Sequence, residues 1–138
     1  MGDLVGKFGA YAGIRVVELA EGIAGPYATR FLADQGADVI KSETTVGDYY
    51  RRDPGFQVLN RNKRSVILGD DTRLLRSADV IVVDESSKVE RARSLAPGSV
   101  IVSMPTWGSA GSLGNQHGSW EQVAAATGIA WNQVSWTE

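Results

Sequence analysis

A cluster of basic residues is the first feature of the sequence that could do chemistry. The chain has 14 Lys and Arg residues, and five of them lie between positions 51 and 64: Arg51, Arg52, Arg61, Lys63 and Arg64. Arginine side chains bind phosphate oxygens through two parallel hydrogen bonds, and the neighbouring Tyr49 and Tyr50 offer rings for stacking. The cluster therefore predicts a phosphorylated, stackable ligand such as a nucleotide. A charged loop exposed to solvent is the alternative interpretation.

A glycine-containing turn is the second candidate site. Residues 21–26 read Glu-Gly-Ile-Ala-Gly-Pro and stand between a β-rich run and a helical pattern. The free amides and the dipole of a helix that starts here could hold an anion. The pattern is not G-x-G-x-x-G and Pro26 has no amide hydrogen, so an NAD site is disfavoured. An ordinary Gly-Pro turn is the alternative.

Two single residues complete the candidates. Cysteine is absent and His117 is the one histidine, which excludes thiol chemistry and a zinc site built from several histidines. His117 lies in a glycine-rich segment, where it could act as an acid or base under a closed lid or be an exposed loop residue. Asp84 follows a strand-like run and could contact a ligand or cap a helix.

The charge balance and the apolar runs limit the partners. The net charge is -2 and the pI is near 5.4, so no global basic field is present and we expect no nucleic-acid partner. No apolar run approaches the ~20 residues that span a bilayer, and the first residues do not resemble a signal peptide. We therefore expect a soluble, cytoplasmic protein without a membrane partner.

Strand and helix patterns alternate along the chain. Apolar, β-branched runs predict strands over 15–19, 37–41, 65–68, 79–83 and 99–103. A helix is expected from Pro26 to Gly36, with Ala24, Ala28, Phe31 and Leu32 as its buried stripe. Further helices are expected after Asp71, after a capping box of Ser87 and Glu90, and after one of Ser119 and Gln122. Residues 42–64 are expected to form a long surface loop.

This order predicts an α/β fold, namely one Rossmann-like domain over residues 1–138 with an open, mostly parallel sheet and helices on both faces. In such sheets ligands bind beyond the carboxyl ends of the strands, here after Leu19, Lys41, Val83 and Ser103. The tryptophan-rich tail, with Trp131 and Trp136, predicts an oligomer interface or a further length of polypeptide.

Several motifs together resemble the amino-terminal part of the class III CoA-transferases, the family of formyl-CoA transferase, carnitine CoA-transferase and α-methylacyl-CoA racemase. The motifs are residues 13–19 (GIRVVEL), 24–29 (AGPYAT) and 32–43 (LADQGADVIKSE), then Gly47-Asp48 with Arg51, and 60–65 (NRNKRS). The resemblance implies a domain that binds CoA or acyl-CoA without a metal and is completed by a second domain in an interlocked homodimer.

The resemblance also implies site residues. The expected CoA contacts are the backbone of Ile23 and Ala24, Leu68 at the adenine end, the basic group Arg61, Lys63 and Arg64, and Asp84. In the transferases a catalytic Asp attacks the acyl thioester, and no residue of this chain matches it. In the racemases a His/Asp pair moves a proton, and His117 is near the position of that His.

We therefore expect the CoA-binding, amino-terminal part of an enzyme that transfers CoA between carboxylic acids, or of an acyl-CoA racemase. The alternative is a shortened, catalytically inactive member that serves as a CoA-binding or oligomeric interaction module. An unrelated enzyme that uses NAD is disfavoured because the dinucleotide motif is missing.

Overall fold

The chain folds into two compact units, Met1–Met104 and Pro105–Glu138, in the computed structural model. The structure describes residues 8–67, 70–114 and 116–132. The expectation of one CoA-binding domain over residues 1–138 stays a prediction. Each unit is treated separately below, and the first contains the sheet.

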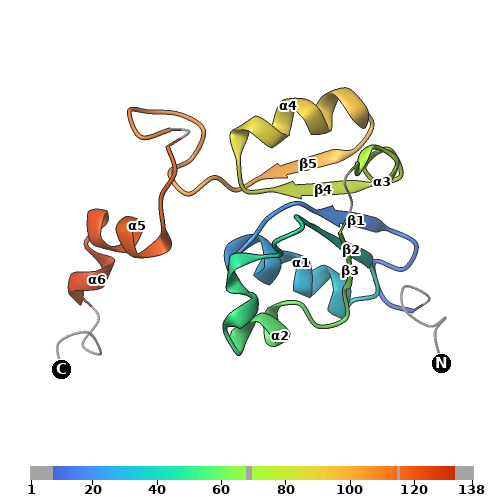
Figure 1. The fold of residues 1–138 in the computed structure, drawn as a ribbon, viewed down its shortest axis with the longest axis horizontal. Coiled ribbons are helices and arrows are strands. Elements are labelled where there is room, and N and C mark those ends of the chain that lie inside the picture. Colours follow the sequence, from blue (N-terminus) through green and yellow to red (C-terminus); the bar gives the residue numbers. More distant parts are fainter. Residues whose placement is uncertain (1–7, 68–69, 115, 133–138) are drawn as a thin grey trace. The chain divides into compact units, whose positions relative to one another are not determined.

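A five-stranded, all-parallel sheet forms the centre of the first unit (Figure 1). Its strands are β1 (Arg15–Glu18), β2 (Asp38–Glu43), β3 (Arg64–Ile67), β4 (Val80–Val83) and β5 (Val100–Ser103). Their order in space is β3-β2-β1-β4-β5, which matches five consecutive strands of the Rossmann order. The chain thus builds outward from β1 in one direction and then starts again on its other side with β4. Open α/β sheets bind ligands beside such a reversal, at the carboxyl ends of the strands, which here are the ends of β1 and β4.

Helices cover both faces of the sheet, as the sequence predicts. Helix α1 (Ala24–Asp34) lies on one face, and α3 (Thr72–Arg76) and α4 (Ser86–Leu95) lie on the other (Figure 1). Alternate residues of β1 take part in the two cores, since Val16 packs with the α1 side and Val17 with the α3 and α4 side. The expected open α/β class with a parallel sheet is therefore confirmed.

The buried face of α1 differs from the expected stripe. Its buried residues are Gly25, Pro26, Thr29 and Ala33, whereas Phe31 is 46% exposed. The predicted stripe gave priority to the large apolar side chains. Leu32 packs against the core as expected. The other positions that α1 turns to the sheet are occupied by small residues, which allows the helix to lie close to it. One consequence is that the hydroxyl of Thr29 lies inside the protein.

Residues 42–64 are not the irregular loop expected from the sequence. They contain the end of β2, a 3-10 helix η1 (Tyr49–Arg52) and a short helix α2 (Gly55–Leu59). The carboxylate of Asp48 accepts the Tyr50 amide at the start of η1. Phe56 and Leu59 bury the inner side of α2. Both elements are too short for a periodic hydrophobic pattern, and this is why the expectation was wrong.

Helix α4 also begins differently. It starts at Ser86 after Glu85, without a side-chain cap, so the capping box expected from Ser87 and Glu90 is wrong. The Ser87 hydroxyl instead donates to the Glu85 carboxylate at 3.2 Å.

The second unit contains α5 (Trp120–Ala126) and α6 (Ile129–Asn132). The capping box of Ser119 and Gln122 at the start of α5 is confirmed. His117 is exposed, and Trp131 is 89% exposed, whereas Trp136 lies outside the described residues. Among the helices that the structure describes, none has the length and apolar character needed to cross a membrane.

Candidate functional site

The candidate site is built around the turn that joins β1 to α1 at the reversal of strand order. Two glycines give this turn its shape. Gly22 has φ +74°, a conformation that other residues adopt only with strain. A Cβ on Gly25 would come within 2.3 Å of the Ala20 Cβ, so only glycine allows the first turn of α1 to lie this close to the end of β1. Ile23 and Ala24, between the two glycines, are exposed.

A buried ion pair from the β2 side holds one part of this turn. Lys41, in the second half of β2, donates to the Ala20 carbonyl at 2.7 Å and contacts Asp48 and Glu18 at 2.8 Å each. The Asp48 carboxylate in turn accepts the Gly22 amide at 3.1 Å. Burial disfavours the charged ammonium, but the two carboxylates outweigh it and raise the pKa of Lys41. Lys41 is therefore a fully charged group inside the protein.

A second ion pair from the β4 side holds the neighbouring peptide groups. Lys88, on α4, donates to the Leu19 carbonyl at 3.0 Å and to Asp84 at 2.7 Å. Asp84, just after β4, accepts the Glu21 amide at 2.9 Å. This pair is less buried than the first, because its two side chains are 28% and 27% exposed. Burial opposes the charge of Lys88, but hydrogen bonds to Asp84 and Glu85 outweigh it and raise its pKa.

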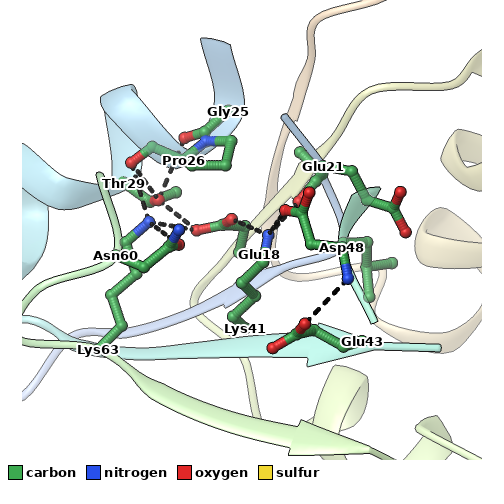
Figure 2. A network of polar contacts seen from close by, with 12 residues as sticks. Glu18, Glu21, Gly25, Pro26, Thr29, Lys41, Glu43, Asp48, Asn60 and Lys63 are labelled. Carbon is green, nitrogen blue, oxygen red and sulfur yellow. Dashed lines mark hydrogen bonds and ion pairs between the residues drawn. The ribbon is translucent and has the colours of Figure 1, made fainter. Parts of the chain in front are cut away.

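Glu18 links the first ion pair to the start of α1 (Figure 2). Its carboxylate accepts hydrogen bonds from Lys63 at 2.8 Å and from the Thr29 hydroxyl. The Lys63 ammonium also donates to the Pro26 carbonyl at 2.8 Å and to Asn60 at 3.0 Å. Burial is the main cause of a lowered pKa for Lys63, although Glu18 opposes it. Lys63 thus ties the first turn of α1 to the end of α2.

Glu43 supports the loop that carries Asp48. It accepts the Asp48 amide at 3.0 Å, the Arg51 guanidinium at 2.7 Å and the Ser65 hydroxyl. Burial disfavours its charge, but hydrogen bonds from Arg51, Ser65 and the Asp48 amide outweigh burial and lower the pKa of Glu43 to about 2. The loop is therefore held in place by a carboxylate that stays ionised at neutral pH.

The exposed part of the turn is suited to an anion. The residue that precedes α1, Ile23, makes no side-chain cap to the helix, and the first turn of α1 contains no acidic residue. The first amides of a helix have no partner within the helix and carry the positive end of its dipole. In the same turn, burial, followed by repulsion from Asp48, raises the pKa of the Glu21 carboxyl group. The site could therefore bind a phosphate or a carbonyl oxygen at the start of α1.

The structure separates the basic residues that the sequence placed together. Lys63 is directed into the buried network, with 2% of its side chain exposed. Arg61 pairs with Asp34 at the last residue of α1, and Arg64 pairs with Asp38 at the first residue of β2. Both arginine side chains are about half exposed, and their aspartate partners stand at the ends of α1 and β2 that are opposite to the β1–α1 turn.

The other predicted site residues lie in different parts of the chain. Asp84 lies at the turn, together with Ile23 and Ala24. Leu68 lies outside the described residues. His117 belongs to the second unit, and its place relative to the turn is not defined. No group of three or more His, Asp or Glu residues that could hold a metal occurs in the described part of the chain.

Sequence reasoning missed the charged residues that build the site. Glu18, Lys41, Asp48 and Lys88 were not candidates. A signal was available for two of them, because Glu18 and Lys41 directly follow the apolar pairs Val16-Val17 and Val39-Ile40 of strands that are largely buried. A charged residue in such a place needs a buried partner, which predicts an ion pair between neighbouring parallel strands.

Comparison with known proteins places this geometry in a family. Relatives include the succinyl-CoA:mesaconate CoA-transferase of Haloarcula marismortui, 40% identical over 95 residues, which are 54% of this chain and 24% of that protein. The succinate–glutarate CoA-transferase of Agrobacterium fabrum is 36% identical over 106 residues, covering 59% of this chain and 26% of the relative. The formyl-CoA:oxalate CoA-transferase of Streptomyces avermitilis is 41% identical over 90 residues, covering 53% of this chain and 22% of the relative. The matched part thus spans about a quarter of the length of these relatives.

Solved structures show the same fold. The protein Rv3272 of Mycobacterium tuberculosis superposes with a TM-score of 0.75 and 28% identity, over 88% of this chain and 39% of that one. A CaiB/BaiF family protein of Brucella suis gives a TM-score of 0.75 and 28% identity, over 85% of this chain and 39% of that one. The family described as CoA-transferase family III matches residues 11–135. Since this match covers most of the chain, the chain belongs to CoA-transferase family III.

Proposed function

We propose that this chain is the CoA-binding, amino-terminal part of an enzyme that transfers CoA between carboxylic acids. The observation that carries the proposal is the family match over residues 11–135 together with the glycine turn at the reversal of strand order. The relatives named above act as CoA-transferases on succinyl-CoA, mesaconate, glutarate, formyl-CoA and oxalate. Their substrates are acyl-CoA thioesters and carboxylic acids, and this is the substrate class that we propose here.

The turn supplies the proposed coenzyme contacts. Ile23 and Ala24 are exposed at the start of α1, where free amides favour a phosphate oxygen of CoA. Gly25 allows the ligand and the helix to approach the end of β1 closely. Asp84 and Lys63 support these contacts indirectly, because their charged atoms bind the backbone of the turn.

Arg61, Arg64 and Leu68 remain proposed contacts of the adenosine end. Each arginine is paired with an aspartate and about half exposed, so a phosphate could replace or share the aspartate. We assign the nucleophilic carboxylate of acyl transfer to a part of the complete enzyme outside residues 1–138. This chain would then bind and orient the thioester but need that carboxylate for turnover.

Isothermal titration calorimetry of the purified chain with CoA and with 3′-dephospho-CoA tests the proposal. We expect micromolar binding of CoA and weaker binding of the compound without the 3′-phosphate. NADH is the matched control, and it should give no heat because the dinucleotide motif is missing. A folded chain that binds neither CoA compound would contradict the proposal and favour an interaction module. Light scattering would then measure the mass of the chain in solution and so its oligomeric state.

A further inference from the structure

The two ion pairs beside the turn contact its backbone in the same pattern. Lys41 donates to the carbonyl of Ala20, and its partner Asp48 accepts the amide two residues later, at Gly22. Lys88 donates to the carbonyl of Leu19, and its partner Asp84 accepts the amide two residues later, at Glu21. We call each ion pair with its two backbone contacts a clamp. The two clamps are offset by one residue along the chain and lie on the sides of β2 and β4, the two strands that flank β1.

This pattern matters because the turn contains residues with much backbone freedom. It contains two glycines, and glycine has more backbone freedom to lose than any other residue. A hydrogen bond between a charged side chain and a peptide group is stronger than a neutral one, especially where water is excluded. Four hydrogen bonds thus hold the three consecutive peptide groups between Leu19 and Gly22, and the middle group is held at both its carbonyl and its amide.

We propose that Lys41–Asp48 and Lys88–Asp84 are paired positioning residues, which fix the β1–α1 turn before any ligand binds. The inference rests on the proposed CoA site, and it goes further by giving Asp84 a role through the backbone rather than through contact with CoA. A turn fixed in advance loses little conformational entropy on binding, which improves affinity without a new contact. The first amides of α1 are then presented in one arrangement.

Asp84 offers the sharper test, because it is partly exposed and its removal leaves the buried pair intact. The amide oxygen of Asn can still accept the Glu21 amide, whereas Ala cannot. We therefore compare Asp84→Asn and Asp84→Ala by amide hydrogen exchange of the free chain and by CoA titration. Asp71→Asn is the matched control, since Asp71 pairs with Arg91 away from the turn.

In Asp84→Ala we expect exchange of the Glu21 amide to accelerate by about tenfold or more, while amides in β1 and β4 keep their protection. CoA affinity should fall by about tenfold in Asp84→Ala and by less in Asp84→Asn, since Asn keeps an acceptor. A purely electrostatic contact with CoA would instead make the two variants equal. Asp48→Asn should accelerate hydrogen exchange of the Gly22 amide more than that of the Glu21 amide.

Unchanged exchange at Glu21 in Asp84→Ala would overturn the inference. A uniform rise in exchange across the sheet would do the same, because it would show general loss of stability. If the unaltered chain binds no CoA, the proposed function fails, and the exchange at Glu21 and Gly22 still decides whether the clamps hold the turn. The two failures are therefore distinguishable.

Discussion

Replacement of Lys41 by Met tests how strongly the buried network supports the fold. The ammonium contacts Glu18 and Asp48 at 2.8 Å and the Ala20 carbonyl at 2.7 Å, and the residue is 1% exposed. Methionine fills similar space but leaves two buried carboxylates without this partner. Removal of one member of a buried ion pair costs about 3–5 kcal/mol. Folded domains are stable by only about 5–15 kcal/mol, so the loss is a large part of the total.

Urea unfolding followed by circular dichroism measures this loss as a shift of the midpoint at unchanged slope. Arg93→Met is the matched control, because Arg93 pairs with Glu90 at 3.3 Å on the exposed side of α4. We expect the control to unfold at nearly the same urea concentration as the unaltered chain, since exposed ion pairs contribute little. If Lys41→Met behaved like this control, the network would not stabilise the fold and our reasoning about it would be refuted.

Three further predictions concern acid stability, the turn and the adenosine end. The pKa of Glu43 is lowered from 4.5 to about 2, so its contribution to stability is complete above 4.5 and is lost as the pH falls toward 2. Glu43→Gln should therefore flatten the dependence of the urea midpoint on pH in this range, and an unchanged slope would contradict the assignment. Gly22→Ala and Gly13→Ala both place Ala at positive φ, which costs about 1–2 kcal/mol, and Gly22→Ala also brings its Cβ within 2.1 Å of the Tyr49 hydroxyl, so it should cost more than Gly13→Ala. Only Gly22→Ala should weaken CoA binding in calorimetry. Equal affinity of the two variants would exclude the turn from the site. The double variant Arg61→Ala, Arg64→Ala should weaken CoA several-fold and reduce its salt dependence while leaving 3′-dephospho-CoA nearly unaffected. An equal loss for both compounds would show that the arginines do not bind the 3′-phosphate.

The order of strands and helices was predictable because each strand contains a short run of apolar, β-branched residues. Val80–Val83 is the clearest case, since four apolar residues in a row are typical of a parallel strand covered on both faces. The end of α1 before Gly36 was predictable from the conformational freedom of glycine. Helix α2 was not, because five residues give no helical period and its stability comes from the burial of Phe56 and Leu59.

The candidate site was predictable in part. The glycine turn was recognised from its place between a strand and a helix. The role of Lys63 was not, because a cluster in sequence says nothing of the direction of each side chain. Of the predicted basic contacts, Lys63 points inward to Glu18. Arg61 and Arg64 instead pair with aspartates at the end of α1 and the start of β2. Tertiary pairing of charges thus separated residues that are neighbours in the chain.

The central claim is that the β1–α1 turn binds CoA, and the most direct test is amide mapping. The chain is labelled with nitrogen-15 and titrated with CoA while the amide resonances are recorded. We predict that the largest shifts occur at Ile23, Ala24 and Gly25, with the same amides shifting less with 3′-dephospho-CoA at equal concentration. Saturable shifts confined to α4 or to the Pro105–Glu138 unit, with the turn unchanged, would contradict the account.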